Sequence, residues 1–205
     1  SLGLVGSEMC IRDRSEGLLT TVAYKLNGEV HYAIEGSIYS CGNIIKWLRD
    51  KMKFFDSADQ SENFLDKSGN SNNVLFLPAF NGLGAPFWNS DIRGGFYGIT
   101  QDTTINDMIT AAFLAITFQT KEITCILEKY GIEINKLLVD GGMVQNEVFC
   151  QILSDTLQKE IIKPINVEST AIGACKVAMI GSGMPLGVVQ SVGRAAHLPL
   201  IDDTV

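Results

Sequence analysis

The chain has little of what a metal centre, a nucleic-acid interface or a membrane span requires. Its 205 residues include only 2 histidines, His31 and His197, so we expect no Cys/His metal site. Lysine and arginine do not cluster, and the net charge of -7 argues against nucleic acid or an anionic membrane as a partner. Runs of 18 or more apolar residues are absent, which predicts that no segment spans a membrane.

Paired cysteines and a dinucleotide fingerprint are missing as well. The 5 cysteines are scattered and odd in number, which indicates reduced, packed thiols and a cytoplasmic location; they are Cys10, Cys41, Cys125, Cys150 and Cys175. No Gly-x-Gly-x-x-Gly turn with a downstream acid is found, which disfavours a dinucleotide-dependent oxidoreductase. An apolar content of 46% is enough for one substantial core.

The hydrophobic pattern predicts an α/β layered domain. Two β-prone runs flank Asn27-Gly28, which is typical of a hairpin, and a helical period starts at Ser37 and continues to Leu48. The longest helix is predicted over 106–130, deeply buried in its first half. Other predicted elements are a short helix at 61–65, strands at 74–77, 95–99, 137–140 and 160–163, and helices at 144–158 and 169–182.

Two segments carry most of the functional information. The loop at 78–88 combines large apolar residues with Gly82, Gly84, Pro78 and Pro86, so its backbone is constrained and we expect it to pack against another domain or a cleft. The second segment, 137–142, is an apolar strand that leads into Asp140-Gly141-Gly142. A strand-to-helix turn with glycines suits a phosphate, but it also suits tight packing alone, and the residues by themselves leave both readings open.

Together these segments resemble the carboxy-terminal half of the glycerol kinases, within the sugar kinases that share an actin-like core. The loop at 78–88 is the specific part, because related kinases for xylulose carry a different sequence there. A second family signature is similar to 94–119, except that Leu114 stands where the family has an acid. The small residues at 170–174 also resemble a family helix start near the nucleotide cleft. The resemblance implies an α/β, actin-like (ribonuclease H-like) ATPase domain, a mixed sheet flanked by helices and truncated at its amino terminus.

The resemblance implies four nucleotide contacts. Gly142 and Asn146 match the family's glycine turn and the Asn four residues later, although Asn146 could equally be a helix cap. Gly42 matches a family glycine that contacts the nucleotide from the opposite side. Lys46 replaces a Gln there, and a solvated surface lysine is an equally good interpretation of that position. Trp88 and Arg93 are expected to brace the loop rather than touch a substrate.

The resemblance further implies the activity: transfer of the γ-phosphoryl group of ATP, with Mg²⁺, to glycerol. The family's catalytic carboxylate lies upstream of Ser15, so no catalytic residue is assigned and the chain alone is expected to be inactive. The expected organisation is a non-native extension at 1–14, which resembles translated adapter DNA, then the ATP-side domain at 15–187 and a ragged tail at 188–205. A homo-oligomer is left open. The competing hypotheses are a kinase for another polyol or a ketose, and a non-catalytic actin-like nucleotide-binding module.

Overall fold

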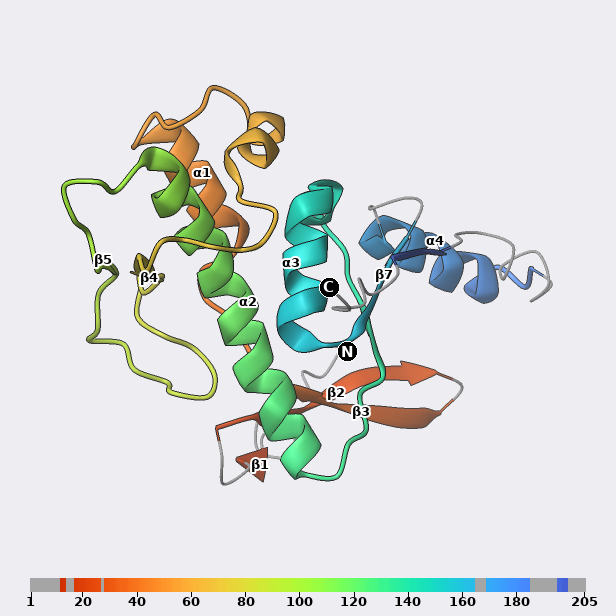
Figure 1. Ribbon diagram of the computed structural model, residues 1–205. Helices are drawn as coiled ribbons and strands as arrows, with labels where there is room; N and C mark the ends of the chain where they lie inside the picture. Colours follow the sequence, from red (N-terminus) through yellow and green to blue (C-terminus); the bar gives the residue numbers. More distant parts are fainter. Residues whose placement is uncertain (1–11, 14–16, 27, 165–168, 185–194, 199–205) are drawn as a thin grey trace.

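The computed structural model describes residues 12–13, 17–26, 28–164, 169–184 and 195–198, and a long central helix organises them (Figure 1). Helices are α1 (Gly42–Asp50), α2 (Ile105–Lys129), α3 (Glu147–Leu157) and α4 (Ser169–Gly181), with 3-10 turns η1 (Ala58–Phe64) and η2 (Gly142–Gln145). Strands are β1 (Arg12–Asp13), β2 (Leu19–Leu26), β3 (Glu29–Glu35), β4 (Leu75–Leu77), β5 (Gly95–Tyr97), β6 (Lys136–Leu138), β7 (Glu160–Pro164) and β8 (Ala195–Leu198).

Helix α2 forms where the sequence predicts it, within one residue at each end. Thr104 caps it: its hydroxyl accepts from the Asp107 backbone, and the Asp107 carboxylate accepts from the Thr104 backbone. Gly131, with φ +78°, follows its last turn. Within the described part of the chain, α2 alone is long and apolar enough to cross a membrane, but 56% of its most apolar window is buried inside the protein.

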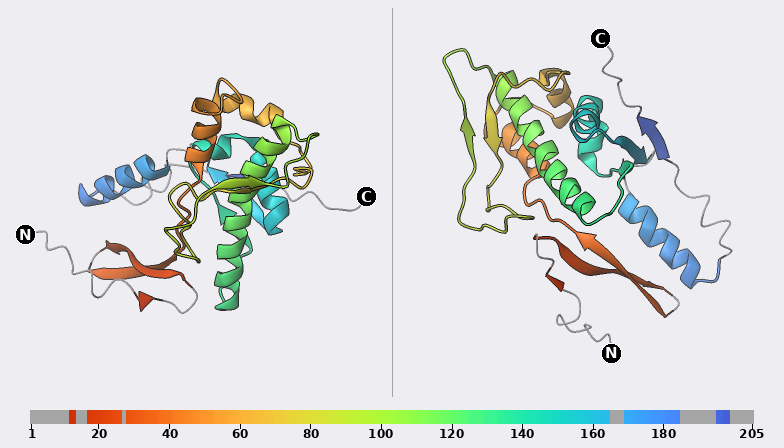
Figure 2. Two further views of the ribbon diagram at one scale, coloured as in Figure 1. Left: turned by 90° about the vertical axis from the view of Figure 1, so that its left-hand side faces the viewer. Right: turned by 60° about the horizontal axis from the view of Figure 1, so that its bottom comes forward.

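Two apolar clusters lie along α2. The larger one joins the first half of α2 to α1, α3 and β4, and at its centre Phe113 packs against Phe149 with ring centroids 5.5 Å apart. The smaller cluster joins the last turns of α2 to the start of the hairpin through Leu18, Ala85 and Ile126. Because α2 contributes to both clusters, it fixes the position of the hairpin relative to α1, α3 and β4 (Figure 2).

The hairpin is confirmed. Strands β2 and β3 pair antiparallel from Leu19↔Glu35 to Leu26↔Glu29, on either side of Asn27-Gly28. Strand β1, which lies inside the segment 1–14, pairs with β2. The domain boundary at residue 15 stays a prediction, and Cys10 lies outside the described residues.

The mixed sheet has three strands, β6-β7-β8, with β6 and β7 parallel and β7 and β8 antiparallel. Strand β8 was missed by the sequence reading, which found no pattern in 188–205. Helix α4 forms as predicted, but its described side chains, which include those of 171–174, are exposed or half-buried, so these small residues do not pack closely. Figure 1 shows α4 set apart from α1 and α2.

Three further predictions need correction. Helix α1 begins at Gly42 rather than near Ser37, because the backbone before it is tied to the loop: the Ala85 amide donates to the Ser37 carbonyl at 2.9 Å. Leu75 in β4 is 59% exposed, so that strand is not wholly buried. The thiols are free but mostly not packed inside: of the four described, only Cys150 is buried, and burial raises its pKa to about 11.

Candidate functional site

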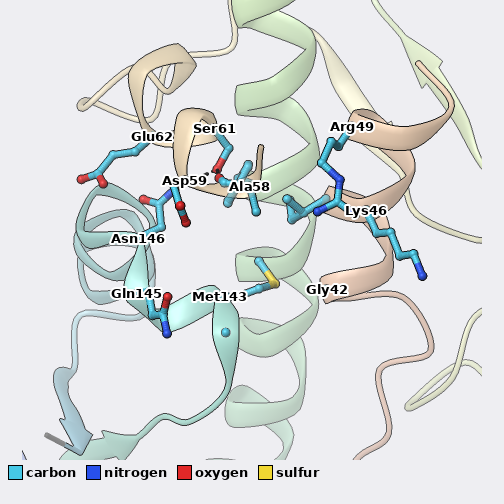
Figure 3. A pocket seen from close by; sticks show the side chains of 13 residues that line it. Gly42, Lys46, Arg49, Ala58, Asp59, Ser61, Glu62, Met143, Gln145 and Asn146 are labelled. Atoms are coloured by element: carbon cyan, nitrogen blue, oxygen red, sulfur yellow. Dashed lines mark hydrogen bonds between the residues drawn. The ribbon is translucent and has the colours of Figure 1, made fainter. Parts of the chain in front are cut away.

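A cavity of about 620 Å³ opens between α1, η1 and η2, with the first half of α2 at its floor (Figure 3). This volume falls in the usual range for small-molecule and cofactor sites. Its lining residues are Gly42, Ile45, Lys46, Arg49, Ala58, Asp59, Ser61, Glu62, Phe113, Gly142, Met143, Gln145 and Asn146. All four residues that the sequence predicted as nucleotide contacts are among them.

The first wall is α1, whose period places Gly42, Lys46 and Arg49 on the cavity side while Ile44 and Leu48 enter the core. The Lys46 side chain extends outward from the wall, away from Met143 and Asn146 (Figure 3). Arg49 donates to the Asp50 carboxylate at 2.7 Å, and this hydrogen bond raises the pKa of Arg49. The wall therefore brings Lys46 to one edge of the cavity, beside an Arg49 whose charge is paired with Asp50.

The opposite wall is η2, and its backbone differs from the direct strand-to-helix turn that the sequence predicts. Gly141, with φ +97°, does not lead directly into an α-helix; Gly142 begins a 3-10 turn that ends at Gln145, and α3 starts only at Glu147. A Cβ atom placed on Gly142 would meet no atom within 4 Å. The backbone at Gly142 is therefore open to close approach by a ligand from the cavity.

Asn146 has the structural role that the sequence left as an alternative. Its Oδ1 accepts from the Phe149 amide at 2.8 Å and so caps α3. Its Nδ2 donates to the Ser61 hydroxyl at 3.3 Å, which joins this wall to η1. The residue is both a cap and part of the cavity lining, so the cap does not exclude a contact with a ligand.

The α1 and η2 walls contact each other through the sulfur atoms of Cys41 and Met143. Cys41, just before α1, places its Sγ 3.4 Å from the Sδ of Met143. Although Cys41 as a whole residue is exposed, desolvation of its sulfur raises the pKa of the thiol, partly offset by a hydrogen bond from the Gly42 backbone. A Cβ on Gly42 would lie 3.9 Å from Met143 Cγ, an ordinary contact distance. The segments that contain Gly42 and Gly142 thus face each other across the contact between Cys41 and Met143.

The third wall, η1, was not predicted as part of the site. Ala58, Asp59, Ser61 and Glu62 line the cavity from a segment that the sequence marks only as polar with a short helix. Neither charge nor spacing in this segment differs from an ordinary surface turn, so the sequence holds no signal for its role. Leu114, the departure from the family signature, is half-buried and does not line the cavity.

The loop at 78–88 lies away from the cavity and packs inside the chain. Trp88 Nε1 donates to the Gly17 carbonyl at 2.5 Å, and Arg93 donates to the Ser90 and Ile92 carbonyls. Trp88 therefore braces the loop, as expected, whereas the hydrogen bonds of Arg93 stay within the segment 90–93 just beyond it. The expectation that the loop faces the cleft is not met at this cavity, whose lining includes none of its residues. In the described part of the chain, no group of His, Cys, Asp and Glu side chains is placed to hold a metal ion.

The mixed sheet, the central helix and this cavity define a domain of the actin-like ATPase fold. The chain belongs to the FGGY family of carbohydrate kinases: the profile of the family's C-terminal domain matches residues 2–182. A glycerol kinase of Marinomonas is 42% identical over 175 residues, and glycerol kinase 1 of Lactiplantibacillus plantarum is 44% identical over 167. These matches cover 85% and 81% of this chain but 35% and 33% of the relatives, so the chain spans about a third of their length.

Solved structures give the same result. The crystal structure of Plasmodium falciparum glycerol kinase with ADP matches with a TM-score of 0.76 and 34% identity, over 91% of this chain and 39% of that one. A ligand-bound xylulose kinase from Lactobacillus acidophilus matches with a TM-score of 0.72 at 20% identity, over 91% and 38%. The second likeness concerns the fold alone.

Proposed function

We propose that this chain is the nucleotide-binding domain of a glycerol kinase, and that its cavity takes ATP and ADP. The proposal rests mainly on the positions of two glycines. Gly42 and Gly142 are one hundred positions apart in the sequence, yet both line one cavity that is large enough for a nucleotide. Both are glycines whose added Cβ would meet no atom closer than 3.9 Å, so each offers bare backbone to a ligand. The related Plasmodium glycerol kinase was crystallised with ADP.

The lining suits a nucleotide chemically. Lys46 supplies positive charge at one edge, where Arg49 is already paired with Asp50, and Asp59 and Glu62 lie on the η1 wall instead. A lysine attracts phosphate as a point charge even where it cannot replace the amide of a Gln. Asn146 and Gln145 supply amide groups, and Ile45, Met143 and Phe113 supply apolar surface for a base. Mg²⁺, when bound with ATP, neutralises charge on the phosphate oxygens. No group in the described residues is placed to hold that ion without the phosphates.

In the proposed reaction the whole enzyme transfers the γ-phosphoryl group of ATP to a terminal hydroxyl of glycerol, giving glycerol 3-phosphate and ADP. Glycerol is favoured over another polyol or a ketose by the loop at 78–88 and by curated relatives that are named glycerol kinases. None of Asp50, Asp91, Asp102 and Asp140 lines the cavity, and we assign none of them as the base that deprotonates the substrate. The four thiols in the described part of the chain are free, which fits a reducing, cytoplasmic setting.

Calorimetric titration of the 205-residue chain with MgADP tests the nucleotide site. The test variant is Gly142→Val, and Gly181→Val is its control, because Gly181 also has open space around its Cβ position but lies at the end of α4, away from the cavity. We expect saturable binding by the wild type and the control, and at least tenfold weaker binding by Gly142→Val. Equal affinity in all three chains contradicts the proposed site.

A coupled assay for ADP release tests the activity. The chain spans about a third of its relatives and no catalytic base is assigned in it, so we expect nucleotide binding without glycerol-dependent turnover. Rapid turnover by this chain alone would show that a base has been overlooked. A longer form of the protein that binds ATP but phosphorylates neither glycerol nor any other polyol would favour the non-catalytic nucleotide-binding module instead.

A further inference from the structure

Ser61 is the one residue of η1 that is fully buried while lining the cavity. It is 2% exposed, and its hydroxyl donates to the Ala58 carbonyl at 2.6 Å within the same turn. The same hydroxyl accepts from Asn146 Nδ2 at 3.3 Å, across 85 positions of sequence. The Ser61 hydroxyl thus closes the turn of its own segment and reaches the opposite wall at once.

These bonds fix the orientation of the Asn146 amide. Its oxygen is committed to the Phe149 amide at the start of α3, so the group cannot exchange its oxygen and nitrogen without losing the helix cap. One of the two hydrogens on Nδ2 is directed to Ser61, which leaves one N–H without an assigned partner. Because Asn146 lines the cavity, this N–H is a donor held in a defined direction.

We propose that Ser61 is a positioning residue for the nucleotide, acting through Asn146. Its hydroxyl holds the amide nitrogen so that the remaining N–H meets an acceptor atom of the ligand, and it joins η1 to the start of α3 so that both walls keep their spacing. This inference rests on the proposed nucleotide site. It adds that the affinity of the site depends on a buried hydroxyl that carries no charge and lies outside the segments recognised by resemblance.

Two substitutions separate the hydroxyl from the amide. Ser61→Ala removes the partner of Nδ2 and leaves the cap of α3 intact. Asn146→Asp keeps an oxygen acceptor for the Phe149 amide, and aspartate is as good a helix cap as asparagine, but it removes the N–H donors. Ser57→Ala is the matched control: Ser57 precedes the same turn, is exposed, makes no capping hydrogen bond and does not line the cavity.

The experiment is a double-mutant cycle in MgADP affinity, measured by calorimetry on the 205-residue chain. We expect Ser61→Ala to weaken binding about 5- to 10-fold, the size of one hydrogen bond, and Ser57→Ala to leave it within twofold. In the Asn146→Asp background, Ser61→Ala should change affinity by less than twofold, because the group it positions is already gone. A residue that only stabilised the fold would give the same factor in both backgrounds.

The outcomes are distinct. Equal factors in the two backgrounds, or wild-type affinity in Ser61→Ala, overturn the positioning role while leaving the nucleotide site in place. A folded wild type that binds no nucleotide overturns both proposals. Should Ser61→Ala unfold the chain, as seen by circular dichroism, Ser61→Cys fills the same buried volume with a poorer acceptor. It should then show the same loss and the same dependence on Asn146.

Discussion

Replacing Asp107 by Asn tests how the central helix is held at its start. The Asp107 side chain is 5% exposed, and its carboxylate accepts three hydrogen bonds: from the Thr104 amide at 2.7 Å, the Thr104 hydroxyl at 2.7 Å and Asn72 Nδ2 at 2.6 Å. The first belongs to the capping box, the second is a further bond between the same two residues, and the third attaches the loop before β4 to α2. Asn has the same shape but only one acceptor oxygen, so one of the two attachments must be lost.

The expected loss of stability is about 2 kcal/mol, because a hydrogen bond to a charged group contributes about 1.5 to 3 kcal/mol net. For a chain of this size, that change lowers the Tm by about 4 to 8 °C. Asp102→Asn is the control, since Asp102 lies in the preceding loop and is exposed, and the substitution removes the same charge. It should change the free energy of unfolding by less than about 0.5 kcal/mol.

The difference between wild type and Asp107→Asn should depend on pH. Hydrogen bonds from Thr104, and then from Asn72, lower the pKa of the Asp107 carboxyl below its usual 3.8. A carboxyl with a lowered pKa in the folded state contributes stability that is complete above the unfolded-state pKa and is lost as pH falls through the folded-state value. The gap between the two proteins should therefore be constant near neutral pH and narrow below about pH 4.

Urea unfolding followed by tryptophan fluorescence measures both effects, because Trp47 packs in the main cluster and Trp88 in the loop at 78–88. If Asp107→Asn and Asp102→Asn have equal free energies of unfolding at pH 7, the carboxylate does not stabilise the helix start as described. A gap that widens on acidification would also refute the reasoning, because it would require a raised pKa.

Two further predictions concern stability. Gly84→Ala should destabilise the chain by more than about 2 kcal/mol in urea unfolding, because the new Cβ would lie 2.1 Å from the Ser37 carbonyl oxygen; Gly181→Ala, with open space, is its control, and similar Tm values for the two would contradict this. Ser40→Ala should raise stability by about 1 kcal/mol, since the buried Ser40 hydroxyl finds no hydrogen-bond partner among the described residues; a drop in Tm in a thermal melt would reveal a partner.

Elements with local signals were predictable from the sequence. The hairpin follows from Asn27-Gly28, and α2 follows from a long apolar period with Thr104 and Asp107 at its start and Gly131 after its end. Helix α1 shows the limit of such signals. Ile38 and Cys41 fit the helical period, but a tertiary hydrogen bond from the loop at 78–88 to Ser37 holds the preceding backbone out of the helix.

Half of the cavity was predictable, and only through resemblance. Gly42 and Gly142 point to it because family members have glycines there, whereas the η1 wall was not recognised. The role of Ser61 depends on its distance from Asn146, 85 positions away, and no local pattern carries that information. Strand β8 was missed for the same reason, since a short strand at a sheet edge is specified by its partner β7.

The separation of the two glycine walls also bears on how the protein is made. Gly42 leaves the ribosome one hundred residues before Gly142. At about 5 to 20 residues per second, this corresponds to a delay of about 5 to 20 seconds. During the first part of that interval the apolar face of α1 has neither α2 nor α3 to cover it, because α2 begins only at Ile105, and the cavity does not yet exist. A nucleotide therefore cannot assist the early steps of folding, and the apolar face of α1 is an exposed, aggregation-prone surface until α2 has emerged.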